Sequence, residues 1–192
     1  EHSYGEWTSD GQGSHIRTCA GCGVEEKEVC DYEYRDDSDA GASGGEGVHV
    51  GVCKVCGYET AQEAHTFTAW EASGAENRYV RICTACGRQH RAEITQSPAQ
   101  IQAAYGEAGE QELSAAVTGA AALYVWKLQG EDAVLSGEGS YSLPDDLAVG
   151  NYTYQCAVTL EGDSEPVVTF SYSLRVTPAD LGEAAVTVEE GD

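Results

Sequence analysis

Three Cys-x-x-Cys-Gly segments hold the residues of this chain that are best suited to chemistry. The segments are Cys19–Gly23, Cys53–Gly57 and Cys83–Gly87, at near-regular intervals in the first half of the sequence. One further candidate ligand opens the stretch before each of them: His2, Cys30 and His65. Thiolate sulfur and imidazole nitrogen are the ligands that tetrahedral zinc takes in structural sites. The spacing therefore predicts metal centres in this half of the chain.

The number of candidate ligands suits three sites of four ligands each. All five histidines and seven of the eight cysteines lie in residues 1–96. The predicted sets are His2, His15, Cys19 and Cys22 for the first site, Cys30, His49, Cys53 and Cys56 for the second, and His65, Cys83, Cys86 and His90 for the third. In the third set His90 substitutes for the histidine that stands four residues before the earlier cysteine pairs, because Tyr79 occupies that place.

One geometric objection applies to these sets. His15 precedes Cys19 by four residues, and in a straight strand that separates their Cα atoms by roughly 13 Å. The strand would have to bend for His15, and likewise His49, to share a metal with the cysteine pair that follows. In the alternative, Cys30 completes the first site and His65 the second, and the third site is incomplete.

Each repeat is typical of a β-hairpin, with short alternating segments on either side of Gly-, Ser- and Asp-rich turns. Folding the repeats about Gly11, Gly41 and Gly74 places each opening ligand beside its own cysteine pair. A unit of about 30 residues is too small to build a sufficient apolar core, whereas a structural zinc supplies on the order of 10 kcal/mol of folding free energy. We therefore expect zinc-stapled, zinc-ribbon-like hairpins at about 1–29, 30–64 and 65–96, with two or three structural Zn²⁺ ions.

Two other uses of the cysteines are weaker interpretations. Disulfides within a Cys-x-x-Cys pair are strained and reducible, and seven cysteines leave one unpaired. A thioredoxin-like redox site requires a strand followed by a helix. The glycine after each pair and the hairpin pattern do not fit that context.

The second half of the chain predicts a β-sandwich. Ser97-Pro98 marks a break, and short alternating segments follow at Gln111–Thr118, Leu123–Leu128, Gly139–Leu143, Tyr152–Leu160 and Val167–Val176. Trp126, Tyr154 and Cys156 resemble the core tryptophan, the corner tyrosine and the second cysteine of an immunoglobulin-type domain. Ala115 stands where the partner cysteine usually lies, so Cys156 is expected to be a lone buried thiol. The sandwich is assigned to residues 97–178, and residues 179–192 to a linker or the start of another module.

Composition excludes several classes of function. The net charge of −23 opposes binding to nucleic acid and to anionic membranes. No apolar stretch is long enough to insert into a membrane. The sequence also shows no Ser-His-Asp order, no phosphate-binding glycine loop and no open metal site, which predicts a protein that is not an enzyme.

The repeats resemble those of large secreted or wall-attached proteins of Gram-positive gut bacteria. The resemblance rests on a segment such as His2-x-Tyr4-x-x-Trp7, followed by His15-x-x-x-Cys19-x-x-Cys-Gly, and covers residues 2–92. In those proteins such repeats recur in tandem between immunoglobulin-like modules. The resemblance implies an extracellular place on a bacterial surface and a structural or adhesive role. The alternative is a module that binds an extracellular ligand, either a glycan or a host protein.

Overall fold

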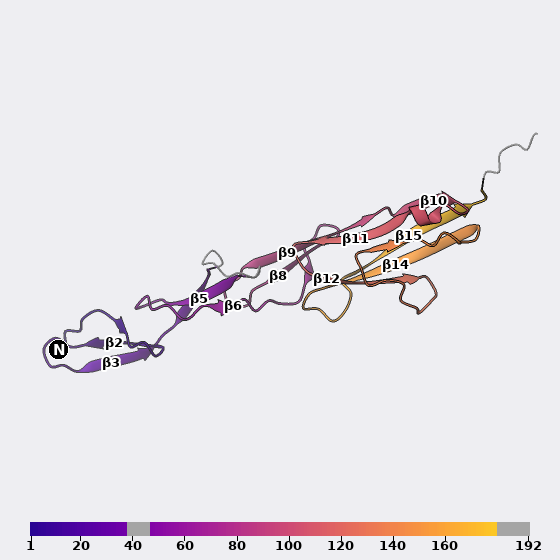
Figure 1. Cartoon of the computed structure of the whole chain (residues 1–192). Coiled ribbons are helices and arrows are strands. Elements are labelled where there is room, and N and C mark those ends of the chain that lie inside the picture. The colour runs from indigo at the N-terminus through magenta and orange to yellow at the C-terminus, as the bar shows by residue number, and fades with distance from the viewer. Residues whose placement is uncertain (38–46, 180–192) are drawn as a thin grey trace, which may run out of the picture. The chain divides into compact units, whose positions relative to one another are not determined.

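The computed structural model describes residues 1–37 and 47–179, and strands dominate throughout (Figure 1). Its contacts divide into two units. The first comprises Glu1–Thr68 and Arg81–His90, and the second comprises Ala69–Val80 and the chain from Arg91 onward. The predicted linker 179–192 lies almost entirely outside the described residues, as does most of the loop from Asp36 to Gly47. No helix in the described part is long and apolar enough to cross a membrane.

The first unit contains two small antiparallel sheets, each built from one repeat. Strands β1 (Thr8–Ser9), β2 (Ser14–Thr18) and β3 (Glu25–Val29) pair in the order β1-β2-β3. Strands β4 (Tyr32–Asp36), β5 (Val48–Cys53) and β6 (Glu63–Ala64) pair in the order β4-β5-β6. The cysteine pair of each repeat begins at the end of the middle strand and continues into the turn. The sequence predicts only the first two strands of each sheet and not the return strand after the pair.

The predicted folding of each repeat about its glycine-rich turn agrees with the observed pairing. Tyr4 bridges to Cys19, and Phe67 bridges to Cys83, in antiparallel fashion. In the second repeat Tyr32 is the partner of Cys53. Each opening ligand, two residues before its aromatic residue, is thereby brought to its own cysteine pair.

The second unit is an immunoglobulin-like sandwich of two sheets. One sheet has the order β10-β15-β14-β12, and the other has the order β13-β11-β9-β8-β7. The strands of the sandwich are β7 (Glu71–Ala72), β8 (Arg78–Ile82), β9 (Gln89–Ser97), β10 (Gln100–Ala104), β11 (Glu112–Thr118), β12 (Ala122–Leu128), β13 (Ser140–Ser142), β14 (Gly150–Leu160) and β15 (Val168–Thr177). The five predicted strands match β11 to β15 closely. The sequence does not predict β10, which pairs in parallel with β15. It also assigns the residues of β7 to β9 to the third zinc repeat, whereas these strands pair in the second sheet of the sandwich.

The core of the sandwich confirms the expected surroundings of Cys156. Trp126 and Cys156 are cross-strand partners, and both are fully buried. The Trp126 ring packs 5.0 Å from that of Tyr172, and its indole N–H donates to the Glu138 carbonyl at 2.8 Å. Cys156 is a free thiol, and Ala115 is buried in the same core. Burial raises the pKa of the Cys156 thiol to about 12.

The tyrosine corner is formed by a different residue from the one predicted. The Tyr152 hydroxyl donates to the Ala148 carbonyl at 2.9 Å, whereas Tyr154 is buried in the core. Both tyrosines point to the same face of β14, because their positions differ by two. Tyr152 lies near the start of the strand, where its hydroxyl reaches the preceding turn.

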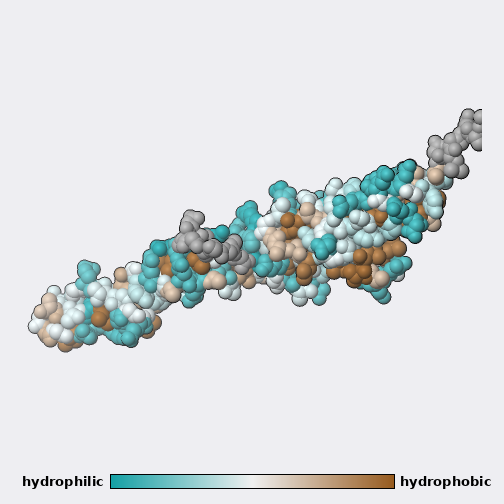
Figure 2. Space-filling view, in the orientation of Figure 1, coloured by the Kyte–Doolittle hydropathy of each residue, from teal (hydrophilic) through white to brown (hydrophobic). Residues whose placement is uncertain are grey.

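Figure 2 shows hydrophilic residues spread widely over the face in view, which agrees with the strongly acidic composition.

Candidate metal centres

The structure brings eleven of the twelve predicted ligands into three clusters, and each cluster is named here by its first paired cysteine. In each cluster the candidate ligand atoms all lie within 4.8 Å of one another. They are the Cys19 site (His2, Cys19, Cys22), the Cys53 site (His15, Cys30, Cys53, Cys56) and the Cys83 site (His49, His65, Cys83, Cys86). The Cys53 and Cys83 sites are largely buried, whereas His2 and Cys22 of the Cys19 site are exposed.

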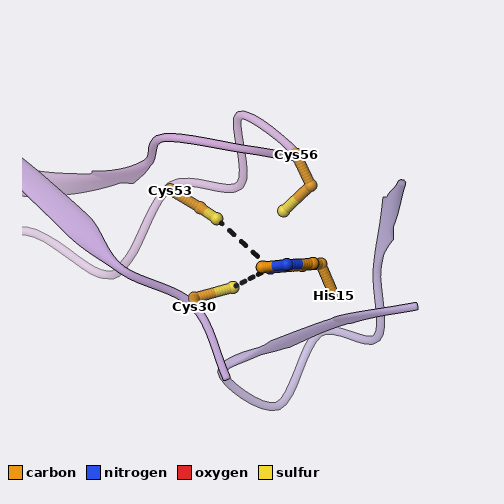
Figure 3. A group of neighbouring side chains, drawn as sticks. All are labelled: His15, Cys30, Cys53 and Cys56. Carbon is orange, nitrogen blue, oxygen red and sulfur yellow. Dashed lines mark hydrogen bonds between the residues drawn. The ribbon is translucent and has the colours of Figure 1, made fainter. Parts of the chain in front are cut away.

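The geometry of the Cys53 site fits a tetrahedral metal. The imidazole of His15 points between the cysteine sulfurs (Figure 3), and its Nδ1 atom is 3.7 Å from Sγ of Cys30 and 3.7 Å from Sγ of Cys53. Zinc bonds of about 2.3 Å to sulfur and about 2.0–2.1 Å to nitrogen, at tetrahedral angles, separate the two ligand atoms by roughly 3.6 Å. The observed separations agree with a shared ion.

The other two clusters have similar separations. Nδ1 of His49 is 3.9 Å from Sγ of Cys83, and Nδ1 of His65 is 3.4 Å from Sγ of Cys86. In the Cys19 site the corresponding distance, between His2 and Cys22, is 3.2 Å. All eight cysteines are free thiols, so the described chain contains no disulfide. The donor sets are those of structural zinc.

The grouping of the histidines differs from both predicted arrangements. His15 belongs to the first repeat but joins the ligands of the second, and His49 of the second repeat joins those of the third. The opening residues Cys30 and His65 stay with their own pairs. The reason is the length of the strand: β2 does not bend to return His15 to Cys19, so its two ends contribute to different sites. The same holds for β5, which carries His49 at one end and Cys53 at the other.

His90, which the sequence places in the third site, belongs to none of the three clusters. Its Nδ1 atom accepts a hydrogen bond of 3.2 Å from Nε of Arg81. The equivalent pair in the first repeat is Glu26 and Arg17, joined at 2.7 Å. His90, four residues after Cys86, therefore takes the position that Glu26 takes after Cys22 in the first repeat, where the side chain is the partner of an arginine.

In the third repeat Tyr79 replaces the histidine that each earlier repeat shares with the repeat after it. It stands four residues before Cys83, as His15 stands before Cys19. Its hydroxyl donates to the Val167 carbonyl at 3.0 Å, and its ring packs against the core of the sandwich. Tyr79 therefore packs against the apolar core and contributes to none of the three metal clusters.

Three carboxylates that the Cys and His spacing does not reveal face the histidines. Each lies near the Nε2 atom of a histidine whose Nδ1 faces sulfur: Glu28 at 3.6 Å from His15, Glu63 at 3.8 Å from His49, and Asp36 at 3.3 Å from His65. At 3.3 Å the Asp36 carboxylate favours the His65 tautomer with hydrogen on Nε2 and leaves the Nδ1 lone pair for a metal. Glu28 and Glu63 face their histidines from beyond hydrogen-bond distance. Glu28 and Glu63 are the direct cross-strand partners of their histidines. Both glutamates lie on the return strand after a cysteine pair, which the hairpin pattern of the sequence does not predict.

The turn of each Cys-x-x-Cys-Gly segment stabilises the thiolate of its first cysteine. Backbone N–H groups of Gly21 and Cys22 lower the pKa of Cys19 to about 6. In the same way the backbone N–H of Cys56 is the main cause that lowers the pKa of Cys53 to about 6. These cysteines are therefore ready to bind a metal at neutral pH, because the thiolate is the ligand form.

Burial acts in the opposite direction at Cys83. It would by itself raise the pKa of that thiol, but hydrogen bonds from the backbone N–H groups of Cys86 and Ala85, together with the side chains of His65 and Cys86, bring the pKa to about 6. The glycine that closes this segment, Gly87, has a φ of 75°, and its N–H donates to the Cys83 carbonyl at 2.9 Å. Only glycine adopts this backbone conformation without cost, which explains its place after the pair.

Comparison with known proteins gives only distant similarities. No family model matches the sequence, and no curated protein is significantly similar to it. Among solved structures, the extracellular domain of a proposed one-component system from B. thetaiotaomicron is 10% identical with a TM-score of 0.38, over 92% of this chain and 31% of that one.

Two further solved structures show the same level of similarity. The extracellular domain of a proposed hybrid two-component system from the same organism is 9% identical with a TM-score of 0.33, over 92% of this chain and 32% of that one. The four N-terminal immunoglobulin domains of Dscam1 isoform 8.4 are 12% identical with a TM-score of 0.37, over 90% of this chain and 60% of that one. The chain thus spans about a third of the two sensor domains. These TM-scores are too low to transfer an activity.

Proposed function

We propose that residues 1–192 are a non-enzymatic segment of a bacterial cell-surface protein, in which structural zinc joins successive β-hairpins to one another. The observation that carries this proposal is the division of ligands in the Cys53 and Cys83 sites. Each site takes three ligands from one repeat and a histidine from the repeat before it. A metal bound there therefore fixes one repeat to the next, besides holding a single hairpin closed.

The ligand number supports a structural role for these two sites. Four protein ligands complete a tetrahedral shell and leave no position for a substrate or an activated water. The ligand side chains are also mostly buried, with His15 only 2% exposed. Such closed sites are typical of structural zinc rather than catalytic zinc.

The composition of the interior of the first unit supports the same role. In residues 1–37, 47–68 and 81–90, Val50 is the only buried apolar side chain apart from cysteine. The other buried side chains include the ligands His15, His49 and His65. Because so little apolar surface is removed from water, the folding free energy must come largely from bound metal.

The extracellular location is supported by the sequence of the repeats. Their likeness to repeats of secreted and wall-attached bacterial proteins implies such a place, and the net charge of −23 suits an exposed surface. A structural or adhesive role follows as the proposed activity. Binding of a glycan or a host protein is the second hypothesis, which a glycan array tests directly.

Native mass spectrometry of the purified chain tests the metal part of the proposal. We expect at least two zinc ions per chain, which are retained after dialysis and removed by a strong chelator. Circular dichroism should show loss of structure when the ions are removed and recovery when zinc is returned. A chain that stays folded and free of metal, with the paired thiols oxidised, would overturn the proposal.

A further inference from the structure

The Cys19 site has one candidate ligand fewer than the other two sites. It contains His2, Cys19 and Cys22, with His2 and Cys22 exposed. All histidines and cysteines of the chain lie within the described residues, and none of the others joins this cluster. His15, which the sequence places here, faces the Cys53 site instead.

The two complete sites show what the fourth ligand is and how it is presented. In both, it is a histidine that stands four residues before the cysteine pair of the preceding repeat, namely His15 or His49. In both, the Nδ1 atom faces the sulfurs and the Nε2 atom faces a glutamate on the next strand, Glu28 or Glu63. The missing position of the Cys19 site is therefore defined by two independent examples in the same molecule.

Contacts at the end of β2 hold the donor histidine and the start of the next repeat side by side. The N–H group of Cys30, the opening ligand of the second repeat, donates to the Gly13 carbonyl of the first repeat at 3.0 Å. The Trp7 ring packs edge-on against His15 at 4.5 Å between centroids. The corresponding opening ligand of the Cys19 site is His2, which is exposed.

We propose that the Cys19 site takes its fourth ligand from a further β-hairpin of the same kind, which presents a histidine four residues before its own cysteine pair. A metal bound there would join that hairpin to the first repeat. The inference rests on the proposed function, since it requires these clusters to hold zinc. The third repeat of this chain cannot be the donor, because Tyr79 occupies the donor position and is held by the Val167 carbonyl.

Cobalt substitution with imidazole as the probe tests the open position. In the full chain loaded with Co²⁺, imidazole should change the visible absorption of one ion of three in a saturable manner. The variant Cys22→Ser should lose this response, because it damages only the Cys19 site. The variant His15→Ala creates the same vacancy in the Cys53 site, so the number of responsive ions should double.

A donor variant of the full chain tests the hairpin partner. The triple variant Cys22→Ser, Cys53→Ser, Cys56→Ser keeps His15 and Glu28 but has lost two ligands of the site that His15 serves. It also lacks an intact Cys19 site, so it cannot accept a second donor. Mixed with the unaltered chain, it should form a zinc-dependent one-to-one complex in analytical ultracentrifugation. The same donor with His15→Ala added is the matched control and should form no complex. Circular dichroism of the two donors verifies that they are equally folded.

The outcomes separate this inference from the proposed function. Three bound cobalt ions with no response to imidazole, or an imidazole response without complex formation by a folded donor, would overturn the partner hairpin and leave the structural role intact. Binding of only two ions would also overturn it, because the Cys19 site would then be empty. Binding of no metal at all would overturn both.

Discussion

Replacement of His15 by alanine tests whether this histidine belongs to the Cys53 site, as in the structure, or to the Cys19 site, as its place in the sequence suggests. His15 lies four residues from Cys19 and 38 residues from Cys53 in sequence, yet its Nδ1 atom faces Cys53 at 3.7 Å. The variant His15→Ala should therefore weaken the metal at the Cys53 site and leave the Cys19 site unchanged.

The size of the effect follows from the number of ligands. A structural zinc site contributes about 10–16 kcal/mol, so one ligand of four accounts for about 2.5–4 kcal/mol. At 1.4 kcal/mol per factor of ten, one zinc ion of the chain should bind roughly 10²- to 10³-fold more weakly. Competition with a chromophoric chelator measures this change. The variant His90→Ala is the matched control and should bind zinc as the unaltered chain does, because His90 belongs to none of the clusters.

Alkylation with peptide mapping shows which site has lost its metal. At a chelator concentration that removes only the weakened ion, iodoacetamide should modify the three cysteines of the Cys53 site: Cys30, Cys53 and Cys56. Cys19 and Cys22 should be protected to the same degree as in the unaltered chain. Preferential modification of Cys19 and Cys22 would refute the observed grouping and restore the arrangement in which each repeat holds its own histidine.

Three further predictions concern the carboxylates, the two units and the core thiol. Asp36→Asn should lower zinc affinity at the Cys83 site about tenfold, the low end of the range for groups that orient a ligand, because Asp36 is partly exposed. Equal affinity in the chelator assay would contradict the orienting role. Removal of zinc should unfold the first unit and leave the near-UV circular dichroism of the sandwich intact, whereas a single joint transition would show that both units depend on metal. Cys156 should react with a thiol reagent at pH 8 only after denaturation, since its pKa of about 12 keeps it protonated. Rapid reaction of the native protein would contradict its burial. Cys156→Ala should cost about 1 kcal/mol of stability in denaturant titration.

The sequence predicts strands β11 to β15 of the sandwich well, because their signals are local. Alternation of apolar residues along a segment such as Tyr152–Leu160 determines which face enters the core, and the structure confirms Trp126 and Cys156 there. Alternation cannot separate two residues on one face, however. The sequence favours Tyr154 for the corner because it stands two residues before Cys156, whereas in the structure the Tyr152 hydroxyl makes the corner contact.

The candidate metal centres were predictable in their residue types but not in their grouping. Spacing along the chain identifies Cys30 as a neighbour of its own pair, since a hairpin turn brings them together. It does not reveal that the next repeat docks on the far end of β2, where His15 lies, because that depends on the packing of one hairpin against another. The separation of about 13 Å between His15 and Cys19 was the one physical clue available in the sequence.

The sharing of histidines between repeats also determines how the chain would respond to a pulling force. With metal bound, the His15 and Cys53 ligands close a segment of 38 residues, and the His49 and Cys83 ligands close one of 34 residues. Tension on the two ends of the polypeptide is carried across each closed segment by metal–ligand bonds, so the residues inside are shielded until a bond breaks. Rupture would then release up to roughly 130 Å and 115 Å of extended chain, respectively. Because thiolate and imidazole can bind the metal again when tension falls, the repeats would act as extensible elements that reset after each stretch.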